Sequence, residues 1–337
     1  MATVYEYIEE NKRRTVLLVL LFPLVFMLLV LATAGLVICL MDTGEVGMST
    51  MTWQGVALSE KQALFFCVAF FLGPVCWVVA MLWIFISYFL GDKMMLMGVG
   101  AVEISKRDQP EIYRLVENLC ITRGLPLPRI YILDDDSLNA FATGRDPQHA
   151  SVALTKGIVK RLERTELEGV IAHELAHVEN RDIRLMLLTV AGISFFTFVG
   201  EILIRAGLSS RSNSNNKGNG NAILALLGLV CLIYGYFLAP LIRLAVSRQR
   251  EYQADATAAL TTRNPRALAS ALHKISSDSR VEALDKRESM AAMCIANPLE
   301  KVGLFSQLTG LLASHPPIEK RIAALLDMDG TAYDTRL

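Results

Sequence analysis

The chain has 337 residues, and its 33 lysines and arginines balance its 33 aspartates and glutamates. Apolar residues make up 53% of it, and the mean hydropathy of +0.40 is too high for an ordinary soluble enzyme. Its neutral charge and the lack of a basic or aromatic platform exclude nucleic acid as a partner. Six cysteines without a C-x-x-C pair exclude a disulfide framework.

Two uncharged, apolar stretches near the amino terminus predict membrane-spanning helices at about 15–41 and 63–90. Each is longer than the roughly 20 residues that a bilayer crossing requires. The first stretch is too long for the apolar part of a cleaved signal peptide, and a second span follows it. We therefore expect residues 1–92 to form an amino-terminal transmembrane hairpin.

The distribution of basic residues predicts the orientation of these spans. Lys12, Arg13 and Arg14 precede the first span, whereas the loop at 42–61 is neutral to acidic. Basic residues are retained on the cytoplasmic side of membranes, and more of them follow the second span. We therefore expect the main domain and both termini to be cytoplasmic, with the loop at 42–61 facing outward.

Residues 93–182 are predicted to form the first half of the main domain. Apolar residues alternate in its strands, and helical periodicity ends where glycine or proline appears. The patterns indicate a strand or interfacial segment at 94–105, a helix at 109–123, a strand at 129–133, a hairpin made of 139–143 and 151–155, and a helical start at 157–163.

A helix is predicted over 164–182, and it carries the sequence His173-Glu174-Leu175-Ala176-His177. Residues four apart lie on one face of a helix, so both imidazoles can bind one tetrahedral metal ion. Glu174 lies beside them, where a carboxylate can hold a water molecule at the metal and accept its proton. The pattern predicts one zinc ion per chain. A helix with two solvated histidines is the alternative.

Two further apolar stretches predict a second transmembrane hairpin over 183–246, with spans at about 183–204 and 222–246 and a polar loop at 208–221. The apolar run before Glu201 gives only about 24 Å of helix, short of a hydrocarbon core of roughly 30 Å. The loop also carries basic residues, which argues against its facing outward. Four complete crossings are favoured, and a partly inserted hairpin is the alternative.

A catalytic zinc ion needs a third protein ligand, and Glu251 is the best-placed residue. If the third and fourth spans are antiparallel, His177 and Glu251 both lie roughly 8–9 Å above the same membrane face. Glu201 is excluded, because a continuous helix would place it about 36 Å from His177. Asp255, one helical turn beyond Glu251, is expected to accept the outward N–H of a metal-binding histidine, and Asp182 is a weaker candidate for that role.

Other residues with metal-binding side chains are interpreted without a metal. The three aspartates at 134–136 favour a solvated turn, because adjacent acids on a loop rarely converge on one ion. His149 in a turn and His273 on a helix have no ligand partner at metal spacing. Glu201 is expected to lie beside Arg205, one turn later, at the membrane edge.

Residues 247–337 are predicted to form the second half of the main domain. Helices are expected at 250–260, 265–276 and 314–328, the last beginning with prolines, while 280–298 has no assignable pattern. The main domain is therefore assembled from two chain segments, 93–182 and 247–337, on either side of the second hairpin.

These motifs in combination resemble the membrane-bound zinc endopeptidases of the HtpX family and, more distantly, the CAAX prenyl protease. The resemblance covers about 98–321 and rests on His173-Glu174-x-x-His177, Glu251-x-x-x-Asp255, Asn139-Ala140-Phe141-Ala142, and Ser314-His315-Pro316-Pro317 with Arg321. It implies a mainly α, integral membrane protein with four transmembrane helices and a gluzincin-like α+β zinc metalloprotease domain that contains a small β-sheet. It also implies a bacterial inner membrane and a role in membrane protein quality control and the stress response.

The resemblance further assigns roles to individual residues. It implies that Asn139, Ala140, Phe141 and Ala142 form an edge strand along which an extended protein substrate binds through its backbone. It implies that His315 and Arg321 face the oxyanion that develops during peptide hydrolysis. Partnership with an ATP-dependent membrane protease is suggested by the resemblance alone, whereas contact with the lipid bilayer follows from the spans.

The sequence therefore predicts hydrolysis of membrane or misfolded proteins, with Glu174 as the general base. Three other classes stay open. An intramembrane protease would carry the motif within a span, but charged residues precede it here. A transporter or channel would need more charged residues inside the spans. A catalytically silent zinc-binding scaffold is the third, and the intact Glu174 argues against it.

Overall fold

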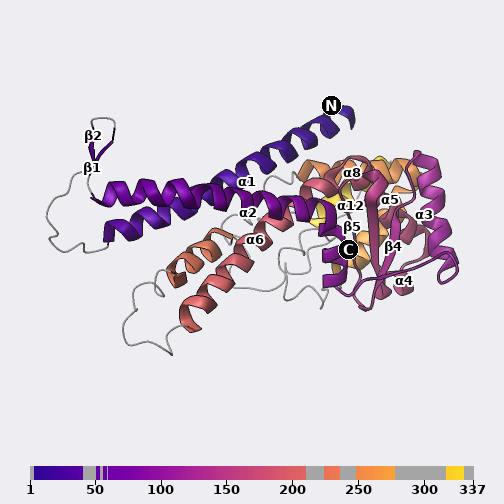
Figure 1. The fold of residues 1–337 in the computed structure, drawn as a ribbon. Coiled ribbons are helices and arrows are strands. Elements are labelled where there is room, and N and C mark those ends of the chain that lie inside the picture. Colours follow the sequence, from indigo (N-terminus) through magenta and orange to yellow (C-terminus); the bar gives the residue numbers. More distant parts are fainter. Residues whose placement is uncertain are drawn as a thin grey trace. The chain divides into compact units, whose positions relative to one another are not determined.

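The computed structural model describes residues 4–40, 51–53, 56–58, 60–209, 224–235, 248–277 and 316–329. The chain divides into two compact units, each built from segments that are far apart in the sequence. The first unit comprises Met1–Thr15, Ser87–Ala191 and Phe237–Leu337, and the second comprises Val16–Ile86 and Gly192–Tyr236. Figure 1 shows the elements of both units.

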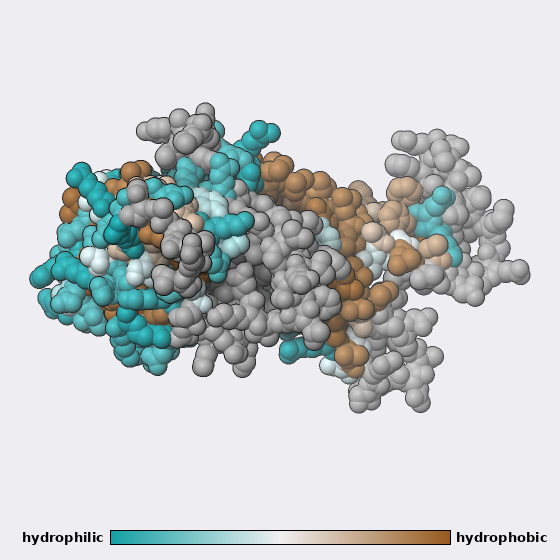
Figure 2. Space-filling view, turned by 180° about the vertical axis from the view of Figure 1, so that it is seen from behind, coloured by the Kyte–Doolittle hydropathy of each residue, from teal (hydrophilic) through white to brown (hydrophobic). Residues whose placement is uncertain are grey.

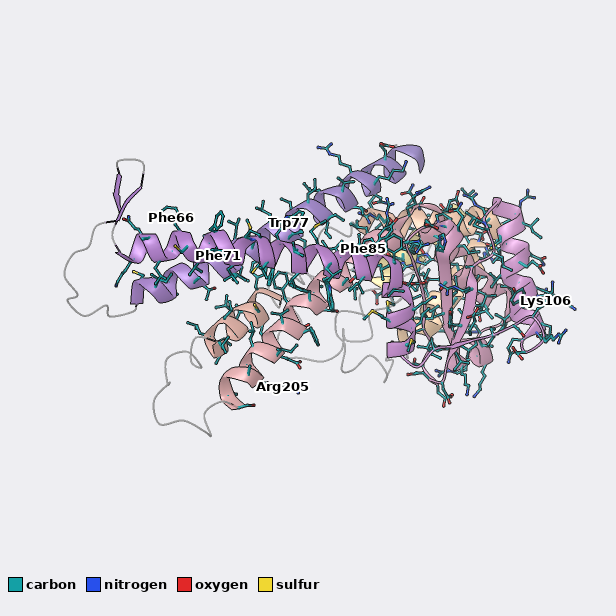
Figure 3. All side chains as sticks on the ribbon, viewed as in Figure 1. Phe66, Phe71, Trp77, Phe85, Lys106 and Arg205 are labelled. Atoms are coloured by element: carbon teal, nitrogen blue, oxygen red, sulfur yellow. The ribbon has the colours of Figure 1, made fainter. Side chains whose placement is uncertain are left out.

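Long apolar helices make up the second unit and extend beyond it. They are α1 (Val4–Leu40), α2 (Glu60–Gly98), α6 (Asp182–Ser209) and a shorter helix, Leu224–Gly235. Among the described residues, three stretches are long and apolar enough to cross a membrane: Glu9–Leu36, Lys61–Gly98 and Asp182–Ser209. Large side chains on α2 such as Phe66, Phe71, Trp77 and Phe85 are exposed and project outward (Figure 3). Hydrophobic residues cover these helices in Figure 2, as expected for a surface in contact with lipid.

The helices differ from the predicted spans in their lengths. Both α1 and α2 contain the predicted spans, but α2 continues to Gly98, well past the predicted end at residue 90. The third span, predicted at about 183–204, lies within α6, which continues to Ser209, and Glu201 pairs with Arg205 one turn later (3.2 Å) as expected. Most of the loop at 208–221 and about half of the fourth span, predicted at 222–246, lie outside the described residues.

Glycine allows α6 to pack closely against the helix Leu224–Gly235. A Cβ atom on Gly200 would lie 2.9 Å from the carbonyl oxygen of Gly228, and one on Gly228 would lie 2.7 Å from that of Gly200. The two backbones are therefore in direct contact, as is common between helices in membranes. α6 also packs against α1, where Phe195 and Phe196 form edge-to-face contacts with Phe22 and Phe26.

A four-stranded mixed sheet forms one layer of the first unit. Its strands lie in the order β3 (Val102–Glu103), β4 (Arg129–Leu133), β6 (Ala150–Thr155) and β5 (Ala140–Gly144). β4 and β6 are parallel and the other pairs are antiparallel, with Ala140 opposite Leu154 in the β5–β6 pair. The predicted β5–β6 hairpin is therefore confirmed, and a 3-10 turn at Pro147–His149 joins its strands.

Three details of this region differ from the sequence predictions. The segment at 94–105 is not one strand, because its first residues continue α2 and only the two residues of β3 pair in the sheet. The predicted strand begins at Asn139, but β5 begins one residue later. The backbone N–H of Asn139 donates to the side-chain oxygen of Thr155 (3.1 Å) and not to a backbone oxygen of the neighbouring strand. A separate hairpin, β1 (Met51–Trp53) with β2 (Val56–Leu58), lies in the loop at 42–61, where no strand is predicted.

Helices build the remainder of the first unit around α5. They are α3 (Pro110–Arg123), α4 (Lys156–Arg161), α5 (Arg164–Glu179), α8 (Arg248–Thr262), α9 (Pro265–Ser277) and α12 (Ile318–Met328). Each falls on a predicted helix, although α4 ends before α5 begins. α5 packs against β5, α8 and α9, and both Val170 and Ile171 are fully buried in the core. The close approach of α9 requires Gly169, whose Cβ would lie 3.2 Å from the backbone of Leu268.

The start of α5 is fixed by the buried carboxylate of Glu166. It accepts hydrogen bonds from the backbone N–H of Glu163 (2.8 Å), from Ser270 (2.6 Å) and from Lys274 (2.7 Å), the last two on α9. Burial alone would raise the pKa of Glu166, but these hydrogen bonds outweigh it and leave the pKa below its ordinary value. The carboxylate is therefore charged and joins the two helices.

We expect Glu166→Gln to lower the free energy of unfolding by about 1–3 kcal/mol, because Lys274 loses its charged partner. Since the folded-state pKa is lowered, this stabilisation is complete above the ordinary pKa of about 4.3 and is lost as the pH falls through the lower, folded value. Thermal unfolding in detergent as a function of pH measures the effect. Glu168→Gln, a half-buried residue on the same helix, is the control, and equal losses in both variants would contradict the assignment.

Candidate active site

The two histidines of α5 and one carboxylate of α8 converge inside the first unit. The Nε2 atoms of His173 and His177, one helical turn apart, lie 3.2 Å from each other. The carboxylate oxygens of Glu251 lie 3.7 Å from Nε2 of His173 and 3.6 Å from Nε2 of His177. His173 and Glu251 are each only 1% exposed. The sequence prediction that these three side chains lie together is therefore confirmed.

A carboxylate on the outward nitrogen sets the tautomer of each histidine. Nδ1 of His173 lies 2.9 Å from Asp255, and Nδ1 of His177 lies 3.1 Å from Asp182. A carboxylate accepts hydrogen bonds, so the neutral form of each ring is favoured with its proton on Nδ1 and its lone pair on Nε2. In this form both lone pairs face Glu251. Asp182 contacts a metal-binding histidine directly, which a charge that only ends a helix would not do.

The arrangement fits a metal ion. The donor atoms of His173, His177 and Glu251 all lie within 4.8 Å of one another, and no other such group occurs in the part of the chain that the structure describes. A tetrahedral zinc site with bonds of about 2.0–2.2 Å has donor atoms roughly 3.3–3.6 Å apart. The two nitrogens lie 3.2 Å apart, close to this range, and Glu251 turns one oxygen toward each ring, Oε2 toward His173 (3.7 Å) and Oε1 toward His177 (3.6 Å).

The electrostatics of the site favour positive charge. Burial lowers the pKa of His177, but the carboxylates of Asp182, Glu251 and Glu174 outweigh burial and raise it to about 9. Metal-free, His177 therefore takes up its second proton near pH 9 and is cationic at neutral pH. Four carboxylates, including Asp255, surround two imidazoles here, so a divalent cation that displaced this proton would neutralise more of their negative charge.

Arg321, on α12, lies beside His173 and Glu251. Its guanidinium is fully buried and donates two hydrogen bonds to Asp255, from Nε (2.8 Å) and Nη2 (2.7 Å). Its Nη1 lies 3.2 Å from Glu251, and Nη2 lies 3.4 Å from Nε2 of His173. Burial would raise the pKa of Asp255, yet Arg321 outweighs it and lowers the pKa to about 2. Asp255 therefore stays ionised and oriented toward His173.

Glu174 is 2% exposed and sits between the two histidines in the sequence of α5. Burial lowers the pKa of His177 and the carboxylates of Asp182 and Glu251 raise it, and the charge of Glu174 adds to that rise, so Glu174 acts electrostatically on a metal-binding residue. Of the ligand side chains, that of His177 is the most open, at 14% exposure. Within the described residues, solvent reaches the site on that side.

Several residues weighed in the sequence lie away from this centre. Asp134 and Asp136 form ion pairs with Lys156 (2.7 Å) and Lys160 (3.5 Å), as a solvated turn would. His149 contacts Asp146 (2.7 Å), and neither His149 nor His273 joins a metal-binding group among the described residues. His315, expected to face the oxyanion, lies outside the described residues.

Two residues of the site were missed in the sequence. Arg250 is buried next to Glu251 and donates a hydrogen bond to Asp182 at 3.2 Å. Asn11, on α1, is 2% exposed and donates to the same carboxylate at 2.7 Å. The role of Arg250 could have been predicted from its position next to the metal-binding residue Glu251 in the sequence. Nothing in the local sequence of Asn11 distinguishes it from an ordinary polar residue before a membrane span.

The chain is similar in sequence to known proteins over most of its length. Residues 106–329 match the model of peptidase family M48. The chain is 39% identical over 323 residues to a protease HtpX homolog of Bacteroides fragilis, covering 94% of this chain and 96% of that one. A protease HtpX homolog of Tropheryma whipplei is 43% identical over 247 residues, covering 72% and 81%. A protease HtpX homolog of Dictyoglomus thermophilum is 36% identical over 324 residues, covering 96% and 94%.

Among solved structures, the chain is similar to S. mikatae Ste24p, at 21% identity and a TM-score of 0.43, covering 78% of this chain and 64% of that one. That TM-score is too low to support a statement about the fold. The family match and the curated relatives, together with the buried histidine pair and the apolar helices, lead to one conclusion. The chain belongs to peptidase family M48 and is a membrane metalloprotease of the HtpX type.

Proposed function

We propose that the protein is a zinc-dependent endopeptidase whose metal ion is held by His173, His177 and Glu251. The observation that carries this proposal is the convergence of two Nε2 lone pairs on one buried carboxylate. Nitrogen and oxygen donors in this ratio are typical of catalytic zinc sites, which keep a fourth position open. Asp255 and Asp182 keep the two imidazoles in the tautomer that the metal requires.

Bound zinc supplies a Lewis acid that polarises the peptide carbonyl and acidifies water. Glu174 accepts the proton of the attacking water and then delivers it to the leaving amine. Arg321 holds Asp255 and contributes positive charge beside His173, which suits the role at the developing oxyanion that the family resemblance assigns to it. His315 has the same proposed role by resemblance alone.

The substrate is proposed to lie along the edge of the sheet. β5 is the last strand in the order β3-β4-β6-β5, and it packs against α5, the helix that carries the metal-binding histidines. The side chains of Ala140, Phe141 and Ala142 are buried in the core. These side chains would not contact a substrate, which would bind through hydrogen bonds to the strand backbone, and such bonds place few demands on the substrate sequence. The amide oxygen of Asn139 accepts a hydrogen bond from the N–H of Ala140 (3.0 Å) and orients the start of the strand.

We propose four membrane crossings, with the catalytic domain and both termini in the cytoplasm and the chain in a bacterial inner membrane. The close contact of Gly200 with Gly228 supports a hairpin of α6 with a fourth span. The basic residues that flank the spans support the orientation. A catalytic domain at the membrane surface is suited to the removal of misfolded membrane proteins, in partnership with an ATP-dependent membrane protease.

Elemental analysis of purified variants tests the metal site. We expect Glu251→Ala to weaken zinc binding by on the order of a hundredfold or more. Zinc sites with four protein ligands have apparent binding energies of about 10–16 kcal/mol, so each ligand contributes several kcal/mol and the loss of one is large. Chelation of the wild type should abolish proteolysis, and zinc should restore it, which a silent scaffold would not show.

Glu201→Ala provides the matched control for this measurement. Glu201 is exposed on α6 and pairs with Arg205, so its removal should leave the zinc content unchanged. Full zinc content in Glu251→Ala would rule out Glu251 as a ligand. Proteolysis that survives complete removal of the metal would rule out the proposed function.

A further inference from the structure

The amino-terminal helix contributes a buried polar side chain to the first unit. Asn11 lies on α1, before the apolar stretch, and is only 2% exposed. Its amide nitrogen donates hydrogen bonds to Oδ1 of Asp182 (2.7 Å) and to the carbonyl oxygen of Asn180 (2.9 Å). Both acceptors lie about 170 residues later in the chain, at the junction between α5 and α6. The side chain of Asn11 is therefore engaged with this junction.

Asp182 connects this junction to the metal-binding histidines. Its Oδ2 lies 3.1 Å from Nδ1 of His177, while its Oδ1 accepts hydrogen bonds from Asn11 and from Arg250 (3.2 Å). One carboxylate oxygen thus contacts the histidine, and the other is held by two donors from different helices. A carboxylate that lost one of these donors would be freer to rotate about its side-chain bonds.

The hydrogen bond from the Asn11 side chain to the carbonyl oxygen of Asn180 also helps to hold Asp182 in place. Asn180 ends α5, and Arg181 follows with a φ of 60°, which turns the chain sharply into α6. This turn brings Asp182 back toward His177. Asn11 binds both the carbonyl oxygen of Asn180 and the side chain of Asp182, so it holds the turn and the carboxylate together.

We propose that Asn11 is a positioning residue of the metal centre, which acts on His177 through the carboxylate of Asp182. This inference rests on the proposed zinc site and extends it to the first helix of the chain. Groups that orient a metal-binding histidine from outside typically change metal affinity by 10–100-fold. Because Arg250 continues to bind Asp182, removal of Asn11 is expected to have an effect at the lower end of that range.

The zinc affinity of the full-length protein in detergent tests this proposal. Asn11→Leu keeps the approximate size of the side chain and removes its hydrogen bonds. We expect the dissociation constant for zinc, measured by competition with a chromogenic chelator, to rise about tenfold. Thr15→Val is the matched control, because Thr15 is buried one turn later on α1 and its hydroxyl bonds only to the backbone oxygen of Asn11 in the described structure (2.7 Å). Its zinc affinity should equal that of the wild type.

A double-mutant cycle separates positioning through Asp182 from general loss of structure. Asp182→Ala should itself weaken zinc binding, and adding Asn11→Leu to Asp182→Ala should cause no further change, since coupled groups are not additive. If Asn11→Leu fails to fold, Asn11→Ala removes the amide without introducing a larger apolar group and goes through the same cycle. The electronic spectrum of the cobalt-substituted variants reports whether the ligand geometry changes as well.

Two results would overturn the proposal. One is a zinc affinity of Asn11→Leu equal to that of the wild type, and the other is the same loss of affinity in the Asp182→Ala background as in the wild-type background. These results differ from failure of the proposed function itself, for which the wild-type protein would bind no zinc at this site.

Discussion

Glu174→Gln is expected to lower kcat for peptide hydrolysis by about 10²–10⁴-fold, the usual contribution of a general base. Glutamine has nearly the shape of glutamate but cannot accept a proton at neutral pH, so the variant keeps the fold and loses the proton transfer. Because Glu174 is not among the three converging donors, zinc should still bind. Hydrolysis of a quenched peptide or of casein, together with zinc content, measures both parts of this prediction.

Glu179→Gln is the control for this substitution. Glu179 lies on the same helix and pairs with Arg123 at 2.7 Å, so its loss removes a carboxylate and an ion pair without touching the metal-binding residues. Its activity should remain near that of the wild type. A Glu174→Gln protein that cleaves as fast as the wild type would contradict the proposed mechanism, and one that has lost its zinc would show that Glu174 supports the metal site instead.

Arg321→Met is expected to lower the free energy of unfolding by about 3–5 kcal/mol, the typical cost of leaving a buried charge without its partner. Asp255 would lose both hydrogen bonds from the guanidinium while remaining 3% exposed, and Glu251 would lose its contact with Nη1. Chemical or thermal unfolding of the metal-free protein measures this loss directly, since bound zinc would compensate part of the negative charge.

Lys320→Met serves as the comparison for Arg321→Met, because Lys320 is the preceding residue of α12 and is exposed. It removes the same charge from the same helix, so it should change the stability by less than about 0.5 kcal/mol, as surface substitutions usually do. A stability loss in Arg321→Met no greater than that in Lys320→Met would mean that the buried hydrogen bonds to Asp255 contribute little.

Some features of the fold and the site are predictable because they follow from local periodicity. The four-residue spacing of His173 and His177 on a helix is enough to place both rings on one face. Glu251 was found by a longer argument, from two membrane spans that return the chain to the same face. The β5–β6 hairpin and the helices of the first unit likewise follow alternation, helical spacing and turn residues.

The rest depends on contacts between residues that are distant in the chain. A surface arginine and a fully buried one, such as Arg321, look alike in a helical pattern, because the pattern does not specify which carboxylate faces the guanidinium. Asn11 shows the same limit, since its partner Asp182 is 171 residues away. The extension of α2 to Gly98 was missed for a different reason, because hydropathy marks where lipid contact ends and not where the helix ends.

The burial of His173 and Glu251 has a consequence for how rapidly a bound ion can exchange. Each is 1% exposed, and each is anchored from outside by Asp255 or Arg321. An ion coordinated by these atoms is shielded on the side of His173 and Glu251 and, among the described residues, can be reached only past His177, whose side chain is 14% exposed. A small chelator should therefore remove the ion faster than a bulky chelator of equal affinity.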